Sequence, residues 1–469
     1  MPPRRRPRPS IPLLSLALCA GLLCSALAAG AQTLAPAIPP PDPRFKADIL
    51  VFVAHPDDEG EISGYLARAV FDQHKRVAVA YGTWGNSGGN LVGTEQAAAL
   101  ADVREIEARQ ALAFLDIHHV WYLGGTDTPG NNVLHSLETW NHGSALEKAV
   151  RLIRLTRPSV ILAWLPDFDV GENHEDHQAA GVIATEAFDL AGNPTAFPAQ
   201  VTPPRNRLGF ANLTEGLRPW QPEKLYYFTD AYFHGWMRGK GPVYSVTAVS
   251  PSKHVPYYQL VAREAAFHAT QQGVGDVAAR ALRTGNYAAV EFPDRFILAK
   301  SLVTGPGTPA TAPIFTGVVP GPIPYAPPPG YRQATDPTLQ LALQLGSPWH
   351  FYRQFWPAHG LGPLGRLYTP EDSVQSGHRL TVPLLLRNNS NRPERMTIQA
   401  ALPPGWRQLT PPRIYLVGPG HFYPVRVTVV APAGQKAGWT RIAWTAQMAS
   451  GGNPGPAVGH AALRVYVLR

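Results

Sequence analysis

The sequence has almost no cysteine: among 469 residues only Cys19 and Cys24 are cysteines, and both lie in the first 31 residues. If that segment is removed, the mature chain has no thiol, which excludes disulfides and thiolate catalysis. Any metal site would then use histidines and carboxylates. Uninterrupted apolar runs of about 20 residues are also absent after residue 31, so no membrane-spanning helix is predicted in the mature chain.

The first 31 residues contain no acidic residue. Four arginines within the first eight residues precede an apolar run over 11–27, which ends in small residues. This three-part pattern is typical of a secretory signal peptide. We therefore predict that residues 1–31 are removed and that the protein is exported, to the periplasm or the exterior. An uncleaved membrane anchor is the alternative interpretation.

The charge gives little indication of a polyanionic partner. The full chain carries +8, but four of its 41 Lys and Arg lie in the predicted signal peptide, which leaves 37 against 33 Asp and Glu. A nucleic-acid-binding protein normally concentrates basic residues on one face, and the sequence has no such concentration; we predict no nucleic-acid partner. The sequence gives no indication of the oligomeric state.

Proline and glycine divide the rest of the chain into four regions. Residues 32–45 form a proline-rich spacer, and residues 304–372 are predicted to form a Pro/Gly-rich linker. Between them, residues 46–303 alternate short apolar runs with helical periodicity, which predicts a Rossmann-like, doubly wound and mostly parallel α/β sheet. Residues 373–469 contain short β-branched runs separated by turn signals and are predicted to form an immunoglobulin-like β-sandwich.

Within the α/β region, continuous apolar runs at 49–54 and 160–164 predict strands that are buried on both faces of the sheet. Helical periodicity predicts helices over 97–115, 176–188 and 257–272.

A first cluster of polar residues follows the strand at 49–54. His55, Asp57, Asp58 and Glu59 come together where the chain must turn at the strand end. Ligands of open α/β sheets bind at the carboxyl ends of strands. Crowded carboxylates repel one another unless a cation lies between them, which favours a metal site. A turn or a helix cap is the alternative for this cluster alone.

A second cluster follows the strand at 160–164 and contains His174, Asp176 and His177. By itself this pattern fits a solvated helix face equally well. Together, the two clusters supply two imidazoles and a carboxylate from separate loops, which is the donor set of an open metal site with positions left for water and substrate. The spacing does not decide whether Asp57 or Asp58 would bind the metal.

Both motifs resemble the PIG-L/LmbE family of zinc-dependent de-N-acetylases. The sequence AHPDDE at 54–59 and HEDH at 174–177 match that family's H-P-D-D-E followed far downstream by H-x-D-H. Weaker parts of the resemblance are the Gly-Gly-Asn of the loop at 88–90, the Arg104-x-x-Glu107 pair, and HATQ at 268–271. The resemblance covers roughly residues 46–300.

The resemblance implies one Zn²⁺ per chain, held by His55, Asp58 and His177. It also implies Asp57 as the general base and His174 as the group that polarises the carbonyl; we expect His174 to be protonated in that role. Zinc lowers the pKa of bound water to roughly 7, and a carboxylate that is not a ligand can then take the proton.

Four further residues are candidates near this site. Asp176 is predicted to accept a hydrogen bond from an imidazole of the site. Glu59 and Asn90 are polar groups expected near the mouth, with capping of a helix start as the alternative for Glu59. Arg104 either contacts a sugar hydroxyl or phosphate of the substrate or pairs with a glutamate on its own helix.

We therefore predict an exported zinc-dependent hydrolase that removes an acetyl group from an N-acetylated sugar of the N-acetylglucosamine type, with a glycan or glycoconjugate as its partner. One alternative is a metal amidase acting on a non-sugar N-acyl substrate. The other is a non-catalytic glycan-binding surface protein.

Overall fold

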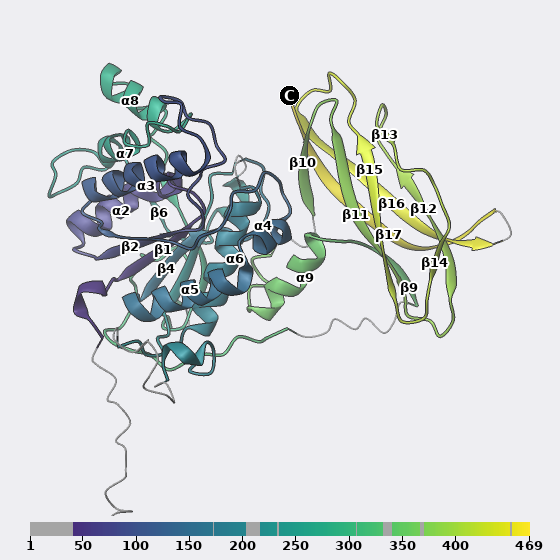
Figure 1. Cartoon of the computed structure of the whole chain (residues 1–469), viewed down its shortest axis with the longest axis horizontal. Helices are drawn as coiled ribbons and strands as arrows, with labels where there is room; N and C mark the ends of the chain where they lie inside the picture. Colours follow the sequence, from purple (N-terminus) through teal and green to yellow (C-terminus); the bar gives the residue numbers. More distant parts are fainter. Residues whose placement is uncertain are drawn as a thin grey trace, which may run out of the picture.

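The computed structural model describes residues 41–171, 173–202, 216–231, 234–305, 307–331, 340–365, 370–450 and 453–469. They form an α/β domain and an all-β domain that lie side by side (Figure 1). The predicted signal peptide and most of the predicted spacer fall outside the described residues. In the part of the chain that is described, no helix combines the length and the apolar character that a bilayer crossing requires.

A six-stranded sheet forms the centre of the α/β domain. In spatial order its strands are β3 (His119–Tyr122), β2 (Val77–Tyr81), β1 (Ile49–Val53), β4 (Val160–Trp164), β5 (Lys224–Phe228) and β8 (Ile297–Ser301). All neighbouring strands are parallel except β5 and β8, so the sheet is mixed. Every residue of β1 and β4 is buried, which explains their continuous apolar sequences. The α/β prediction for this region is confirmed.

Helices cover both faces of the sheet. Figure 1 shows α2 (Ser63–Ala67), α3 (Ala97–Phe114) and α7 (Tyr257–Ala265) on one side, and α5 (His142–Thr156) and α6 (Glu175–Leu190) on the other. The domain also contains η1 (Pro43–Phe45), η2 (Asp58–Ile62), η3 (Arg68–Asp72), α4 (Val133–Thr139), η4 (Pro198–Gln200), η5 (His234–Met237), α8 (Gly275–Thr284), and the antiparallel pair β6 (Val243–Tyr244) and β7 (Asp294–Arg295).

Helix α6 lies unusually close to the sheet. A Cβ atom added at Gly181 would come within 2.3 Å of the Trp164 carbonyl oxygen, so only glycine permits this approach. Almost all of α6 is buried, and its small residues allow the close packing. The first turn of α6 is thereby held beside the carboxyl end of β4.

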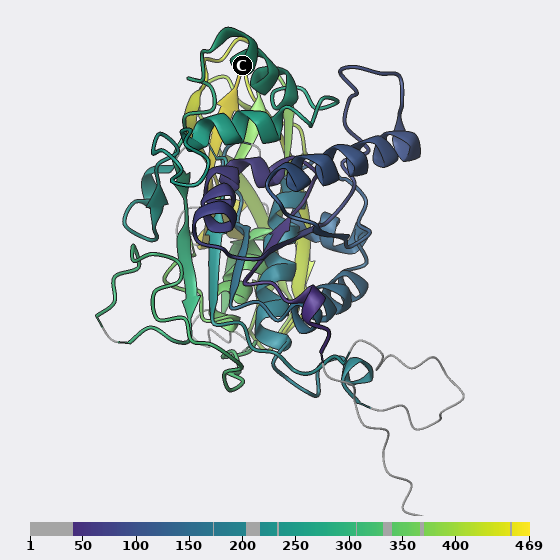
Figure 2. The same ribbon diagram turned by 90° about the vertical axis from the view of Figure 1, so that its left-hand side faces the viewer.

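The C-terminal region is all-β, as predicted. One sheet contains, in order, β10 (Glu371–Gln375), β17 (Asn453–Leu468), β16 (Gly438–Ser450), β12 (Glu394–Ala401) and β14 (Tyr415–Val417). The other contains β13 (Arg407–Gln408), β15 (Phe422–Val430), β11 (Arg379–Asn388) and β9 (Leu341–Leu345). Buried and less buried side chains alternate along β11, as expected for a strand with one face on a core. Figure 2 shows this domain behind the α/β domain.

Residues 304–372 differ from the predicted linker. Strand β9 pairs with β11 of the C-terminal domain, and α9 (Trp349–Ala358) buries Phe355 and Trp356 in the core of the α/β domain. The proline and glycine that suggested a linker are concentrated before residue 331, whereas α9 is rich in aromatic residues. Their burial fixes this part of the chain between the two domains, because large apolar side chains gain most from leaving water.

Candidate metal centre and active-site cavity

The first polar cluster forms a tight turn directly after β1. Asp57 has φ 123°, a conformation that side-chain-bearing residues rarely adopt, and Asp58 begins η2. Holding a non-glycine residue there costs on the order of 1–3 kcal/mol, so the surrounding contacts must fix it. The turn therefore directs the side chains of the two adjacent aspartates to different surroundings.

Asp58 is oriented by three donors. Its Oδ2 atom accepts hydrogen bonds from the Ala54 amide (2.8 Å), the His55 amide (2.7 Å) and Trp164 Nε1 (2.8 Å). Its Oδ1 atom lies 3.1 Å from His177 Nε2 and 3.7 Å from His55 Nδ1. One carboxylate oxygen is thus held by the fold, and the other faces the two imidazoles.

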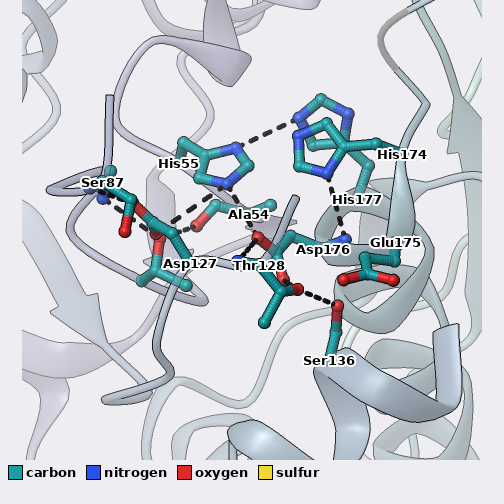
Figure 3. A network of polar contacts seen from close by, with 12 residues as sticks. Ala54, His55, Ser87, Asp127, Thr128, Ser136, His174, Glu175, Asp176 and His177 are labelled. Carbon is teal, nitrogen blue, oxygen red and sulfur yellow. Dashed lines mark hydrogen bonds and ion pairs between the residues drawn. The ribbon is translucent and has the colours of Figure 1, made fainter. Parts of the chain in front are cut away.

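The second cluster lies at the start of α6. His174 is the N-cap residue, and its Nδ1 accepts a hydrogen bond from the Asp176 amide (3.3 Å). His177 stacks on Trp164 with 4.5 Å between ring centroids, and its Nε2 lies 3.2 Å from His55 Nδ1. Figure 3 shows the ring of His55 close to the rings of His174 and His177.

Three donor atoms therefore share one place: His55 Nδ1, Asp58 Oδ1 and His177 Nε2. Their separations are 3.1, 3.2 and 3.7 Å. Two ligands at about 2.1 Å from a tetrahedral zinc ion lie about 3.4 Å apart, so this arrangement fits a single ion. His174 also offers a nitrogen within 4.8 Å of those of His55 and His177.

Asp176 lies on the far side of His55. Its Oδ2 atom is 3.4 Å from His55 Nε2 and accepts the Thr128 amide (2.7 Å), while Thr128 Oγ1 donates to Oδ1 (2.7 Å) (Figure 3). Asp127 Oδ1 is 4.0 Å from the same His55 nitrogen. An Nε2–H directed at Asp176 would leave the Nδ1 lone pair of His55 facing the metal position.

The pKa values of the two adjacent aspartates, Asp57 and Asp58, are shifted in opposite directions. Burial, reinforced by the charge of Asp58, raises the pKa of Asp57 well above its ordinary value. For Asp58, burial acts in the same direction, but contacts with His177 and His55 outweigh it and lower the pKa well below its ordinary value. Two neighbouring carboxyls with divergent pKa values suit a division between proton transfer and ligation.

His174 differs from the expectation of a protonated imidazole. Burial, followed by repulsion from His177 and His55, lowers its pKa to about 3. His174 is therefore neutral near pH 7. Because its Nδ1 accepts the Asp176 amide, the remaining proton lies on Nε2, which can still donate a hydrogen bond.

A cavity of about 920 Å³ opens over the cluster. Its walls come from the turn after β1, the glycine-rich loop, the loop before α4, the start of α6 and the segment after α7; they include Asp57, Ser87, Arg104, Asp127, His174 and Gln271. The predicted site residues thus come together at the carboxyl ends of the strands, as open α/β sheets favour.

Arg104 and Asn90 both line the cavity, and both also hold the glycine-rich loop. Arg104 donates to the backbone carbonyls of Gly85 and Gly89. Asn90 Oδ1 accepts the amides of Val92 (3.1 Å) and Gly93 (2.8 Å). Of the two alternatives for Arg104, pairing with a glutamate of its own helix is replaced by these backbone contacts.

Glu59 does not lie at the mouth of the cavity. Its side chain is fully buried, with Oε2 accepting the Asp57 amide (3.1 Å) and Oε1 lying 3.1 Å from His268 Nε2. The expectation that Glu59 lies near the mouth is therefore wrong, because the turn after β1 directs its side chain inward.

Sequence reasoning missed Asp127 and Thr128, which orient the cluster from the loop after β3. They lie a few residues beyond a strand end, so the rule that located the other two clusters could have found them. Trp164, the last residue of β4, also belongs to the surroundings of the site. In the structure it is 1% exposed and donates to Asp58 Oδ2, so it supports the aspartate and does not face the cavity.

Together the fold and the cluster define a class: an α/β protein whose strand ends present an open His-His-Asp site beside an additional carboxylate. Comparisons with known proteins agree. Residues 50–188 match the family model described as "PIG-L: GlcNAc-PI de-N-acetylase". Both motifs lie within this match, so the resemblance to that family is confirmed for this segment.

Two curated proteins are similar to part of the chain. A 1D-myo-inositol 2-acetamido-2-deoxy-alpha-D-glucopyranoside deacetylase 1 of Catenulispora acidiphila is 28% identical over 176 residues, covering 34% of this chain and 54% of that protein. A probable N-acetyl-alpha-D-glucosaminyl L-malate deacetylase 2 of Bacillus cereus is 30% identical over 143 residues, covering 30% of this chain and 60% of that protein. The chain thus spans little more than half the length of these relatives.

Among solved structures, the N,N'-diacetylchitobiose deacetylase from Pyrococcus horikoshii aligns with a TM-score of 0.38 and 17% identity, covering 66% of this chain and 97% of that one.

Proposed function

We propose that this chain is an exported, zinc-dependent hydrolase that removes an acetyl group from an N-acetylated sugar of the N-acetylglucosamine type. The observation that carries the proposal is the convergence of His55 Nδ1, Asp58 Oδ1 and His177 Nε2 within 3.7 Å of one another. Asp57 lines the same cavity. The family match and the names of the similar proteins support a deacetylase.

His55, Asp58 and His177 would hold the zinc ion. Bound there, it would lower the pKa of a water molecule to roughly 7 and polarise the amide carbonyl. Asp57 takes the proton of the attacking water and returns it to the nitrogen as the C–N bond breaks, which yields acetate and a free amine. His174 Nε2–H donates to the carbonyl oxygen as negative charge develops on it.

The cavity supports a sugar substrate. Its volume of about 920 Å³ far exceeds the space that an acetyl group needs, and hydroxyl, carboxylate and amide side chains such as Ser87, Asp127 and Asn131 line it. Such groups recognise hydroxyls by hydrogen bonds. The same catalytic residues would serve a non-sugar amide, so the substrate is tested separately.

The first experiment measures bound zinc and acetate release in two variants. Asp57→Asn is expected to keep stoichiometric zinc and to lose about 10²–10⁴-fold in kcat, because only the proton acceptor is removed. His177→Ala is expected to lose zinc and activity together. His118→Ala, at an exposed turn, is the matched control. Wild-type activity in both site variants would refute the proposal, and wild-type protein without zinc would favour the non-catalytic glycan binder.

A second experiment identifies the class of substrate. Acetate release is compared for chitooligosaccharides, N-acetylglucosamine conjugates and N-acyl amino acids; release from the last alone would favour the amidase alternative.

A third experiment tests export. The N-terminal sequence of protein secreted by an expression host is expected to begin near residue 32. A mature protein that retains residues 1–31 would refute the proposed cleavage.

A further inference from the structure

A second cluster of ionisable side chains lies behind Asp57, away from the cavity. Glu59, Glu264 and His268 have no exposed surface. His268 Nε2 lies 3.1 Å from Glu59 Oε1 and 3.7 Å from Glu264 Oε1. The short contact directs the Nε2–H of His268 at Glu59, because a buried carboxylate without a donor is strongly unfavourable, while Glu264 lies beyond hydrogen-bond distance of the same nitrogen.

The cluster is connected to the proposed general base through Glu59. While Oε1 of Glu59 faces His268, Oε2 accepts the amide of Asp57 (3.1 Å), the residue whose φ is 123°. Gln271, three residues after His268, donates to the carbonyl of Pro56. The carbonyl and the amide of the Pro56–Asp57 peptide group are therefore both held by side chains, the carbonyl by Gln271 and the amide by Glu59, which contacts His268.

This segment is itself anchored to the fold. The Thr270 amide donates to Glu107 Oε1 (2.9 Å) and the Thr270 hydroxyl to Glu107 Oε2 (2.7 Å), which fixes the turn to α3. A turn fixed in this way can hold a neighbouring backbone in a conformation that it would otherwise leave.

We infer that His268 is a positioning residue: held beside Glu264, it orients Glu59, which fixes the backbone of Asp57 so that the Asp57 carboxylate is aimed into the cavity. This inference rests on the proposed function, in which Asp57 moves the proton. It adds a residue that lies outside the matched family segment of 50–188.

The metal ligands do not depend on this contact. Asp58 is oriented by the amides of Ala54 and His55 and by Trp164. Loss of the His268 N–H should therefore lower turnover without lowering zinc binding. That separation distinguishes positioning of the base from general loss of structure.

The test compares His268→Leu, which removes the donor, with His268→Gln, whose amide nitrogen can take the place of Nε2 and still donate. His118→Leu at an exposed turn is the matched control for the loss of an imidazole. For His268→Leu we expect at least a tenfold loss of kcat, an unchanged KM and full zinc content; for His268→Gln we expect recovery to within about threefold of wild type.

A second readout needs no activity. Hydrogen exchange of the Asp57 amide, followed in metal-free protein on a peptide spanning 55–60, is expected to be at least tenfold faster in His268→Leu than in wild type or His268→Gln. If no substrate is hydrolysed by wild type, the proposed function fails while the exchange result still tests the contact.

Three results would overturn the inference. The first is a folded His268→Leu protein with wild-type kcat and exchange. The second is loss of zinc in parallel with kcat. The third is a His268→Gln variant that is as impaired as His268→Leu in both kcat and exchange.

Discussion

Two clusters of imidazoles and carboxylates flank Asp57, and they differ in access to solvent. The open cluster of His55, Asp58 and His177 lines the cavity. The closed cluster of Glu59, Glu264 and His268 has no exposed surface. Both contain the residue types that bind metals, so composition alone does not distinguish them.

The difference between the clusters is one of geometry. In the open cluster each side chain directs one atom toward a shared position that a ligand can reach from the cavity. In the closed cluster the Glu59 carboxylate meets the His268 imidazole and a backbone amide, so its charge is used within the fold. A buried charge that pairs with its neighbours supports structure, whereas one that faces an open cavity is available for chemistry.

The sharpest test of this comparison applies the same kind of substitution to each cluster. Asp58→Asn is expected to abolish zinc binding and to lower turnover at least about 10³-fold, because an amide is a poor ligand and its NH₂ faces His177. Glu264→Gln should keep full zinc content. Elemental analysis and acetate release measure both. Equal zinc loss in the two variants would show that the clusters are not independent.

Asp372 shows what happens to a buried carboxyl that has no imidazole beside it. Burial raises the pKa of Asp372 from 3.8 to about 6, although Asn131 donates to its Oδ1 atom (2.8 Å). Contacts with histidines lower the pKa of Asp58 instead. The neighbouring groups thus decide the direction of the shift at two equally enclosed aspartates.

This contrast predicts a pH effect on stability. Because the folded-state pKa of Asp372 is raised, the protonated carboxyl contributes to the free energy of unfolding. This contribution is fully present below about pH 4 and is lost as the pH rises through about 6. The loss corresponds to about 3 kcal/mol at 1.36 kcal/mol per pH unit. We expect urea unfolding at pH 4, 5 and 7 to show that the free energy of unfolding of wild type falls by about 3 kcal/mol relative to that of Asp372→Asn between pH 4 and pH 7. A constant difference across these pH values would contradict the prediction.

The smallest predicted effect concerns the support of the open cluster. Trp164→Phe keeps a ring against His177 but removes the N–H that donates to Asp58 Oδ2 (2.8 Å). Loss of such an outer contact typically costs about 10–100-fold in metal affinity. Competition with a chelator measures the zinc Kd, and Trp121→Phe, a tryptophan outside the cavity lining, is the control. An unchanged Kd would show that the two amides suffice to orient Asp58.

Much of the site could be predicted because the sequence shows where the buried strands end. The apolar run at 49–54 predicts a strand, and β1 spans Ile49–Val53. The run at 160–164 coincides with β4. Since parallel strands end at one edge of the sheet, polar residues that follow two such runs are brought together. The two continuous apolar runs therefore located both clusters.

Other features depended on packing. Periodicity predicted one helix over 257–272, but α7 ends at Ala265, and the turn that follows places His268 and Thr270. Similarly, the composition of 304–372 did not indicate α9, whose aromatic side chains pack in the core of the α/β domain. Contacts between residues far apart in the sequence override local preference in both segments.

By itself, the sequence determined which residue types are available and which strand ends present them: His and Asp donors at two neighbouring turns, in a chain whose cysteines are confined to residues 1–31. The tertiary structure decided which carboxylate faces the imidazoles and which faces inward, because that depends on the positive φ of Asp57 and on donors from Trp164 and His268. The physical reason is that the direction of a buried carboxylate follows the donors packed around it, and those donors come from distant parts of the chain.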